Sequence, residues 1–161
     1  MQKIHGSHPA ELRLAVNGDA EVISQMARDL VERGLPWTWN AKRVRQQIED
    51  GSTNVLMAMQ GREVVGFAIA KFGFENVHLN LLAVRPDNRR MGTGANLISW
   101  QEHVAIAGGL RAVELEVRAN NLEAQVFYRR CGYEAVDRLA KYYNGQEDAI
   151  RMRHNLQFST K

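Results

Sequence analysis

Hydrophobic and polar residues along this chain alternate with two different periods. Leu12, Leu14 and Val16 alternate with charged or small residues, which is the period of two expected of a half-buried β-strand. Between residues 22 and 31, apolar positions recur every three or four residues, as they do on the buried face of a helix. Gly34 is expected to end this helix, because glycine readily takes the left-handed backbone that closes many helices.

The same two periods predict strands and helices along the rest of the chain. A second helix is expected from Asn40, which can cap it, to Ile48, and two strands follow around the turn Gln60-Gly61-Arg62. A helix at 95–107 is expected to bury an apolar stripe made of Leu97, Trp100, Val104 and Ala107. The remaining predicted elements are strands at 55–59, 64–72, 77–84 and 111–118, a helix at 122–130, and a hairpin of strands at 133–143 and 147–153.

This order of elements is that of an α/β protein with a mixed central sheet of about seven strands and helices on both faces. The strands at 77–84 and 111–118 are joined by a helix, so they are expected to lie parallel through a right-handed crossover. No linker or repeat divides the 161 residues, so a single domain is expected over 1–161. Its core is expected at about 9–155, because residues 1–8 carry no pattern and are expected to be disordered.

The segment between the strand at 77–84 and the helix at 95–107 is the most informative part of the chain. It reads Val84-Arg85-Pro86-Asp87-Asn88-Arg89-Arg90-Met91-Gly92-Thr93-Gly94. Unpaired backbone N–H groups and the helix dipole at such a turn attract an anion, and glycine lets a ligand approach the main chain. The turn is therefore predicted to hold a phosphate or diphosphate, with a glycine-containing helix start that binds nothing as the alternative.

Two common phosphate-binding loops do not match this turn. A P-loop requires Gly-Lys followed by Ser or Thr, whereas this turn ends in Gly94-Ala95-Asn96. A dinucleotide-binding loop requires a third glycine, and Leu97 occupies that position. A phosphate loop of another kind is therefore expected.

A second group of polar side chains lies where the other parallel strand ends. On the strand at 111–118, the side chains of Glu114, Glu116 and Arg118 face away from the apolar ones. Asn121 is expected to cap the following helix, and Tyr128 lies about two helical turns after it. A carboxylate, an amide and a phenol are therefore expected to converge at the carboxyl end of the parallel strands, where ligands of such sheets bind.

Composition and charge exclude several classes of protein. A net charge of +3 is modest for a dedicated nucleic-acid binder, and the arginines at the turn lack interleaved aromatic residues. The single cysteine, Cys131, excludes an internal disulfide framework and provides no metal-binding pattern, so no metal is expected. No apolar run is long enough to cross a membrane and the polar start does not resemble a signal peptide, so a cytoplasmic protein is expected.

The pattern Arg89-x-x-Gly92-x-Gly94 resembles the pyrophosphate loop of the GNAT superfamily of N-acetyltransferases. A second motif of that superfamily is similar to Leu115-Glu116-Val117-Arg118-Ala119-Asn120-Asn121, followed by Ala124, Tyr128 and Cys131-Gly132-Tyr133. Leu35-Pro36-Trp37-Thr38 and the hairpin that contains Tyr142-Tyr143 resemble one branch, the N-terminal acetyltransferases of the ribosomal-protein alanine type. The likeness extends from about Leu12 to Met152 and implies the GNAT fold.

The resemblance implies an enzyme that transfers the acetyl group of acetyl-CoA directly to a primary amine. The acceptor expected from the branch is a protein or peptide N-terminus. A small amine, such as a polyamine, an amino acid or a drug, is an alternative acceptor, and a non-catalytic acetyl-CoA-binding protein is a second alternative. No nucleic-acid or membrane partner is implied, and the oligomeric state stays open, a homodimer included.

The resemblance also implies roles for particular residues. Tyr128 is expected to protonate the leaving thiolate and Glu116 to deprotonate the amine, with His78 and Asn80 as weaker base candidates. Trp37, Tyr142 and Tyr143 are expected to bind the acceptor, with ordinary packing or surface cover as the alternative for each. The residues expected to bind acetyl-CoA are Leu82, Ala83, Val84, Arg89, Arg90, Met91, Gly92, Thr93, Gly94, Ala95, Asn121 and Tyr128.

Overall fold

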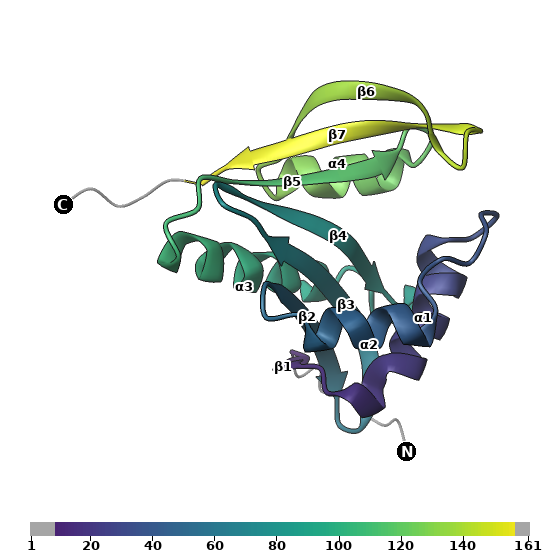
Figure 1. Ribbon diagram of the computed structural model, residues 1–161, viewed down its shortest axis with the longest axis vertical. Helices are drawn as coiled ribbons and strands as arrows, with labels where there is room; N and C mark the ends of the chain where they lie inside the picture. Colours follow the sequence, from purple (N-terminus) through teal and green to yellow (C-terminus); the bar gives the residue numbers. More distant parts are fainter. Residues whose placement is uncertain (1–8, 157–161) are drawn as a thin grey trace, which may run out of the picture.

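A mixed seven-stranded sheet runs through the centre of the protein, in the order β1-β2-β3-β4-β5-β7-β6 (Figure 1). The structure is a computed structural model that describes residues 9–156. Helices cover both faces of the sheet, as the sequence predicts (Figure 1). Residues 1–8, for which the sequence predicts disorder, lie outside the described residues.

The observed elements follow the predicted order, with small shifts at their ends. The strands are β1 Glu11–Leu14, β2 Thr53–Gln60, β3 Glu63–Phe72, β4 Asn76–Val84, β5 Ala112–Arg118, β6 Glu134–Tyr143 and β7 Glu147–Asn155. The α-helices are α1 Ala20–Met26, α2 Ala41–Glu49, α3 Thr93–Ala107 and α4 Leu122–Arg130, with shorter helical turns at Asn17–Asp19, Ala27–Val31 and Pro86–Asn88. None of the helices within residues 9–156 is long and apolar enough to cross a membrane.

Strands β4 and β5 are parallel, as predicted, and α3 connects them. Their register pairs only Asn76 with Ala112, Val77 with Val113 and His78 with Glu114. Beyond these pairs the two strands diverge (Figure 1). Within residues 9–156, the part of β4 that follows His78 therefore has no strand beside it on the β5 side.

A β-bulge in β4 changes which helices its side chains face. In the register between β3 and β4, Asn80 is the residue without a partner. Before the bulge, Val77 and Leu79 belong to the core cluster that includes residues of α3, and after it Leu81 belongs to the cluster with α1 and α2. His78 alternates with Val77 and Leu79, so its side chain faces the side of the sheet on which α1 and α2 lie.

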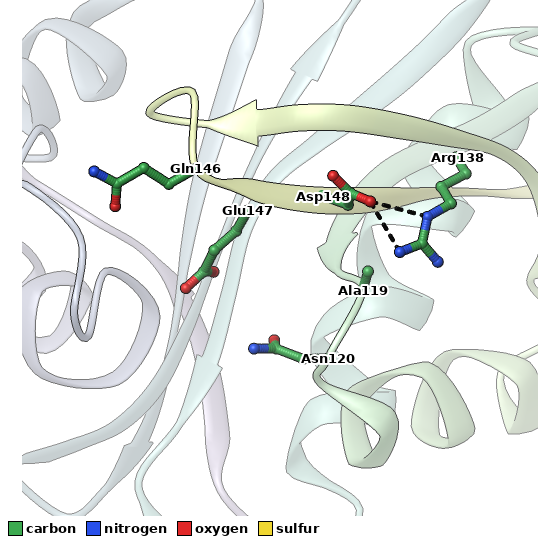
Figure 2. A pocket seen from close by; sticks show the side chains of 6 residues that line it. All are labelled: Ala119, Asn120, Arg138, Gln146, Glu147 and Asp148. Carbon is green, nitrogen blue, oxygen red and sulfur yellow. Dashed lines mark hydrogen bonds and ion pairs between the residues drawn. The ribbon is translucent and has the colours of Figure 1, made fainter.

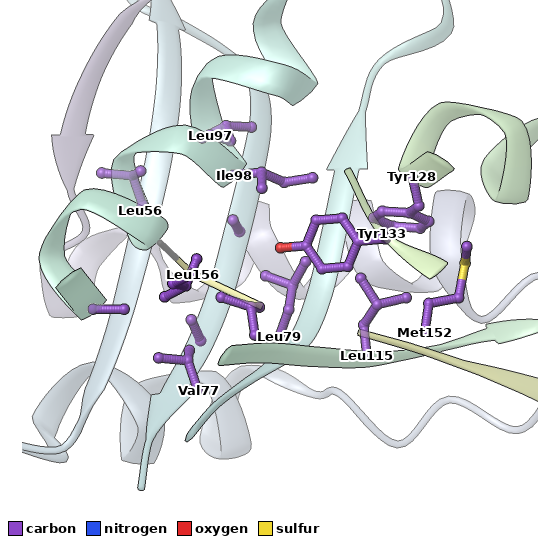
Figure 3. Close-up of a cluster of buried hydrophobic side chains, with 14 of the residues drawn as sticks. Leu56, Val77, Leu79, Leu97, Ile98, Leu115, Tyr128, Tyr133, Met152 and Leu156 are labelled. Carbon is purple, nitrogen blue, oxygen red and sulfur yellow. The ribbon is translucent and has the colours of Figure 1, made fainter. Parts of the chain in front are cut away.

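Two clusters of buried side chains hold the layers together. One lies between the sheet and the helices α3 and α4, and its members include Leu79, Leu97, Leu115, Tyr133 and Met152 (Figure 3). The other joins α1 and α2 to the opposite face of β2, β3 and β4. Each fully buried large apolar side chain contributes about 1.5–3 kcal/mol through its removal from water. The two layers therefore fix the strands that carry the polar residues of the site.

The buried face of α3 differs from the predicted stripe. Leu97 is buried as predicted, but Trp100 and Val104 are only partly buried and Ala107 is exposed. The buried residues of this helix are Thr93, Leu97, Ile98, Gln101 and Ala105. The helix carries apolar residues around much of its circumference, so their spacing alone does not identify the face that the sheet covers.

Gly66 on β3 provides a test of how closely β3 packs against β4 and α3. A Cβ at this position would lie 2.9 Å from the backbone oxygen of Ala83 and 3.3 Å from the side chain of Leu97. Gly66→Ala is therefore expected to lower the free energy of unfolding by about 1–3 kcal/mol, because the backbone cannot move aside without disturbing the sheet. Urea unfolding followed by circular dichroism measures the change.

The matched control for this measurement is Gly18→Ala, because a Cβ at Gly18 would meet no atom within 4 Å. Gly18→Ala is expected to leave the unfolding midpoint close to that of the wild type. Equal midpoints for the two variants would contradict the close packing at Gly66.

Candidate functional site

The turn between β4 and α3 has the geometry of an anion-binding loop. Arg90 and Gly92 have left-handed φ angles of 62° and 80°, and α3 begins at Thr93. The first hydrogen bond of the helix runs from the Asn96 N–H to the Gly92 oxygen at 2.9 Å. The N–H groups of residues 93–95 therefore have no acceptor within the helix and point out of its end, where the helix dipole adds positive charge.

The second glycine of the turn packs closely against α4. A Cβ at Gly94 would lie 3.0 Å from Cζ of Phe127, so a larger residue here would require the phenyl ring to shift. Arg89, Arg90 and Met91 are exposed, and the Arg89 Nε donates to the last carbonyl of β4 at 3.2 Å. The turn therefore places two exposed guanidinium groups beside a set of backbone donors.

Among the described residues, the last ones of β4 have one backbone edge with no strand beside it. Leu82, Ala83 and Val84 pair with β3, whereas the pairing with β5 ends at His78. Ala83 is buried, and Leu82 and Val84 are partly buried. An extended ligand arm can pair with such an edge as a strand would. The edge and the donors of the turn together fit a diphosphate joined to an extended chain, as in acetyl-CoA.

Glu116 lies at the centre of a hydrogen-bond network that joins three strands. Its side chain is 8% exposed, and its Oε2 is 2.5 Å from Nε2 of His78 on β4. Its Oε1 accepts two hydrogen bonds from Arg151 on β7, both at 3.2 Å. The other ring nitrogen of His78, Nδ1, is hydrogen-bonded to Oδ1 of Asn80. The expected base and the two weaker candidates are therefore one connected group.

Burial and neighbouring charges act in opposite directions on this group. Burial raises the pKa of the Glu116 carboxyl, but the hydrogen bonds and charges of His78 and Arg151 outweigh it, so the pKa lies below its ordinary value. The hydrogen bond to Glu116 raises the pKa of His78 above 6.5 despite burial, with smaller contributions from Asn80 and Glu114. Glu116 is thus a carboxylate at neutral pH.

Tyr128 lies on α4 and is buried among aromatic rings. Its ring meets those of Phe127 and Tyr133 at an angle, with centroid distances of 5.2 and 5.8 Å. Burial raises the pKa of Tyr128, and the neighbouring Tyr143 raises it further. Burial also raises the pKa of Tyr143, to which the nearby Tyr142 and Glu116 add. Tyr143 is therefore close to both Tyr128 and Glu116, the two expected catalytic residues.

The hairpin of β6 and β7 positions Tyr142 and Tyr143. Their rings meet edge to face with centroids 5.0 Å apart, and Tyr142 is 46% exposed. Just before them β6 bulges, and Lys141 takes a left-handed φ of 52°. The Asp148 carboxylate accepts the Lys141 N–H at 2.9 Å and so fixes the bulge. The two tyrosines therefore stand on a constrained hairpin.

A shallow cavity of about 370 Å³ lies beside this hairpin (Figure 2). Asn120, from the turn after β5, and Glu147, from the start of β7, point into it, and Asp148 pairs with Arg138 at its side (Figure 2). None of its lining residues belongs to the glycine turn. The cavity is therefore separate from the glycine turn and lies between the end of β5 and the hairpin of β6 and β7.

The segment between α1 and α2 holds its two tryptophans in different surroundings. Trp39 is 8% exposed and the Arg43 guanidinium lies 3.7 Å from its ring centre, so Trp39 is a core residue. Trp37 is 43% exposed, and its Nε1 donates to the carbonyl oxygens of Ser24 and Trp39 at 3.2 and 3.1 Å. Of the two, Trp37 offers the larger surface to an acceptor.

Arg151 and Glu32 organise the site but were not identified from the sequence. The signal for Arg151 was the alternation along the predicted strand at 147–153, which places Arg151 on its polar face, opposite Glu116. Glu32 is buried, and its carboxylate accepts the N–H groups of Thr38 and Trp39 at 2.9 and 2.7 Å. No pattern marked Glu32, because one carboxylate on a helix is usually solvated.

Arg118 was placed on the polar face of its strand, but its partners were not predicted. Its guanidinium donates to the carbonyl oxygens of Val31 and Arg33, at 3.0 and 2.7 Å. It also lies 3.7 Å from the Glu147 carboxylate. The end of β5 is therefore attached to the segment that carries Trp37.

Asn121 is exposed, and its Oδ1 accepts the Ala124 N–H at 3.1 Å, so it caps α4 as predicted. Its expected contact with acetyl-CoA stays a prediction. Cys131 is partly buried, and burial raises the pKa of its thiol. Among the residues that the structure describes, no group of three His, Cys, Asp or Glu side chains is placed to hold a metal ion.

Comparison with known proteins agrees with this geometry. Residues 24–133 match the family model for the acetyltransferase (GNAT) family. An uncharacterized N-acetyltransferase of Methanocaldococcus jannaschii is 37% identical over 90 residues, which are 55% of this chain and 58% of that protein. N-alpha-acetyltransferase 30 of Xenopus laevis is 28% identical over 139 residues, which are 83% of this chain and 49% of that protein. The chain thus spans about half the length of these two relatives.

A third relative matches over most of its length. The ribosomal protein bS18-alanine N-acetyltransferase of Escherichia coli is 28% identical over 129 residues, which are 78% of this chain and 86% of that protein. The crystal structure of the Escherichia coli ribosomal-protein-S18-alanine N-acetyltransferase has the same fold, with a TM-score of 0.80 and 23% identity over 94% of this chain and 96% of that chain. Because the family match covers more than half of the chain and the fold agrees, this chain belongs to the acetyltransferase (GNAT) family.

Proposed function

We propose that this protein is an N-acetyltransferase that moves the acetyl group of acetyl-CoA directly to a primary amine, with a protein or peptide N-terminus as the acceptor. The observation that carries the proposal is the divergence of β4 from β5. It leaves a free backbone edge that leads from the glycine turn toward the strands that carry His78 and Glu116. The proposal includes the cytoplasmic location that the composition favours.

Members of this family use acetyl-CoA, which supplies an activated thioester to the reaction. In this chain the N–H groups of Thr93, Gly94 and Ala95 would hold the diphosphate, and Arg89 and Arg90 would add positive charge. The edge at residues 82–84 would pair with the pantetheine arm and offer an N–H to the acetyl oxygen. The fit is supported by the exposed arginines and by the left-handed backbone of the turn.

The diphosphate grip can be tested at Gly92. A side chain at a φ of 80° costs about 1–2 kcal/mol, so Gly92→Ala is expected to weaken coenzyme A binding by about tenfold. Titration calorimetry with coenzyme A measures the loss. Pantetheine, which lacks the diphosphate, is expected to bind the wild type and the variant with equal affinity.

Gly109→Ala is the matched control, because Gly109 follows the other end of α3 with a φ of 76° and has no atom within 4 Å of an added Cβ. It carries the same backbone strain away from the turn. A loss of coenzyme A affinity in Gly109→Ala as large as that in Gly92→Ala would speak against the assigned grip.

The base would act on the amine nitrogen that forms the new bond, and the acid would act on the sulfur whose bond breaks. The amine nitrogen bonds to the acetyl carbon while the carbon–sulfur bond breaks. Glu116 would take a proton from the ammonium, and Tyr128 would give its phenolic proton to sulfur and regain one from the amine. Burial keeps Tyr128 protonated at neutral pH, and the same desolvation raises the proton affinity of a thiolate formed beside it.

Tyr128→Phe removes the proposed acid while keeping the ring. Turnover in a thiol-release assay is expected to fall by about 10²-fold, with coenzyme A affinity similar to that of the wild type. The control is Tyr133→Phe, because the Tyr133 hydroxyl donates to Glu102 of α3 at 3.2 Å and has no assigned role in catalysis. Unchanged turnover in Tyr128→Phe would remove this residue from the acid role.

Support for a peptide acceptor comes from two relatives and from the surface around Glu116. N-alpha-acetyltransferase 30 and the bS18-alanine enzyme act on protein N-termini by their names. The exposed aromatic rings of Trp37 and Tyr142 and the cavity beside the hairpin offer area for more than a single amine. Aromatic side chains provide such area at a low entropic cost.

The acceptor class can be decided with one thiol-release panel. Short peptides that begin with Ala or Ser are expected to be acetylated, and Tyr142→Ala is expected to raise the KM for them by about tenfold or more, through loss of aromatic contact. Turnover of free polyamines, amino acids or aminoglycosides without turnover of peptides would reject the N-terminal acceptor. It would favour the small-amine alternative.

A further inference from the structure

His78 and Glu116 connect β4 to β5 at the point where the backbones cease to pair. The last register pair of the two strands is His78 with Glu114, and Glu116 is the next residue of β5 on the same face. Its Oε2 is 2.5 Å from Nε2 of His78. A side-chain hydrogen bond therefore continues the connection where the strands start to diverge.

The hydrogen bonds of His78 leave neither ring nitrogen free. Nδ1 faces the amide oxygen of Asn80, and Nε2 faces the carboxylate oxygen of Glu116. Both partners are acceptors, so one proton lies on Nδ1 and a second lies between Nε2 and Oε2. The pair therefore holds one exchangeable proton, which either group can carry.

We propose that His78 and Glu116 act as a single base for the acceptor amine, in which Glu116 receives the proton of the ammonium and His78 stores it and releases it to solvent. This inference rests on the proposed acetyl transfer and adds the route by which the proton leaves. The cycle starts when the pair has lost its shared proton to water. The ammonium N–H bond then breaks, the proton moves to Oε2 and is shared with Nε2, and the amine nitrogen keeps the electron pair needed for attack.

The exposure of the two side chains suits this division of roles. Glu116 is 8% exposed, whereas His78 is 42% exposed. A carboxylate with so little contact with water needs a neighbour through which protons reach solvent. The imidazole is that neighbour, and the hydrogen bond to Asn80 holds the ring with Nδ1 protonated, so that Nε2 exchanges the proton.

The charged groups of β5 and β7 around His78 are paired with one another. Glu114, the register partner of His78, binds Arg153 at 2.5 Å. Glu116 binds Arg151 at 3.2 Å through the oxygen that His78 does not use. Each carboxylate on this face of β5 therefore has its own arginine, and of the two only Glu116 is also hydrogen-bonded to the imidazole.

The strands on the other sides of the pair add one cation and two phenols. Lys71 on β3 is a register partner of His78, but its Nζ lies 2.7 Å from the Asp50 carboxylate, which offsets its charge. Tyr142 and Tyr143 on β6 are neutral, because burial raises the pKa of each phenol and the nearby Glu116 raises it further. None of these groups provides a competing proton acceptor near neutral pH.

The direction of the pH dependence follows from the two partners. The hydrogen bonds and charges of His78 and Arg151 lower the pKa of Glu116 despite burial, so within the pair the shared proton lies closer to His78 at neutral pH. The bond to Glu116 raises the pKa of His78 above 6.5, so the imidazole holds the shared proton more tightly than a free imidazole would. The pair must be unprotonated to act, so turnover is expected to rise with pH across a pKa above 6.5.

The pairing can be measured without acetyl-CoA or an acceptor. The chain has five histidines, and His78→Gln assigns the imidazole proton signal of His78 in NMR spectra. The titration of His78 is expected to have its midpoint above 6.5 in the wild type and at a lower pH in Glu116→Gln and Asn80→Ala. An unshifted midpoint in Glu116→Gln would overturn the pairing.

The role in turnover is measured as kcat against pH, with acetyl-CoA and one acceptor at saturation. His78→Gln is expected to lower kcat at neutral pH by about tenfold or more and to move the acid limb to lower pH, because only the carboxylate remains. Asn80→Asp is expected to move the limb to higher pH, since it adds a negative charge beside Nδ1. Because all variants are measured with the same acceptor amine, the titration of that amine affects every pH profile equally.

His103→Gln is the matched control, because His103 is an exposed histidine on α3 whose Nδ1 lies near Ser99. Its profile is expected to match that of the wild type. The pH profile of His78→Gln is expected to differ from that of the wild type by more than the profile of His103→Gln does. If it does not, the proton route alone is overturned. Coenzyme A binding without thiol release on any amine would overturn the acetyl transfer and the proton route together.

Discussion

The site depends on the early end of backbone pairing between β4 and β5. Parallel strands normally continue their hydrogen bonds along their length, but here the register stops at His78 and Glu114. In the described part of the chain, the β5-facing edge of β4 beyond His78 has no strand beside it, and Glu116 reaches across to His78 by its side chain instead. The bulge at Asn80 shifts the alternation of β4 by one residue, so that Val77 and Leu79 pack in the layer with α3 whereas Leu81 and Ala83 pack in the layer with α1 and α2.

Charges in the diverging region are balanced within the protein. An isolated buried carboxylate would cost several kcal/mol, and Glu116 avoids that cost through Arg151 and His78. The neighbouring register pair repeats the arrangement with Glu114 and Arg153. An ammonium group that approaches Glu116 therefore meets a carboxylate already bonded on both oxygens. The deprotonation of that ammonium group therefore depends on how readily the partners of Glu116, His78 and Arg151, release or accept charge.

Local signals made most of the fold predictable. The caps Asn40 and Asn121, the glycine turn before α3 and the alternation on β5 each lie within a few residues of the element that they define. Contacts between distant strands were not predictable in this way, since Glu116 is 38 residues from His78 and 35 from Arg151. The sequence pattern also did not predict the bulge in β4, because the residues after it are apolar whichever face they occupy.

Arg118 has a consequence for the order in which the protein assembles. It caps the carbonyl oxygens of Val31 and Arg33, which precede it by 87 and 85 residues. During synthesis from the N-terminus, those oxygens stay uncapped until β5 has emerged, and Glu116 lacks Arg151 until β7 has followed. Contacts of such separation form slowly. The glycine turn before α3 is therefore synthesised well before the hairpin that carries Tyr142 and Tyr143.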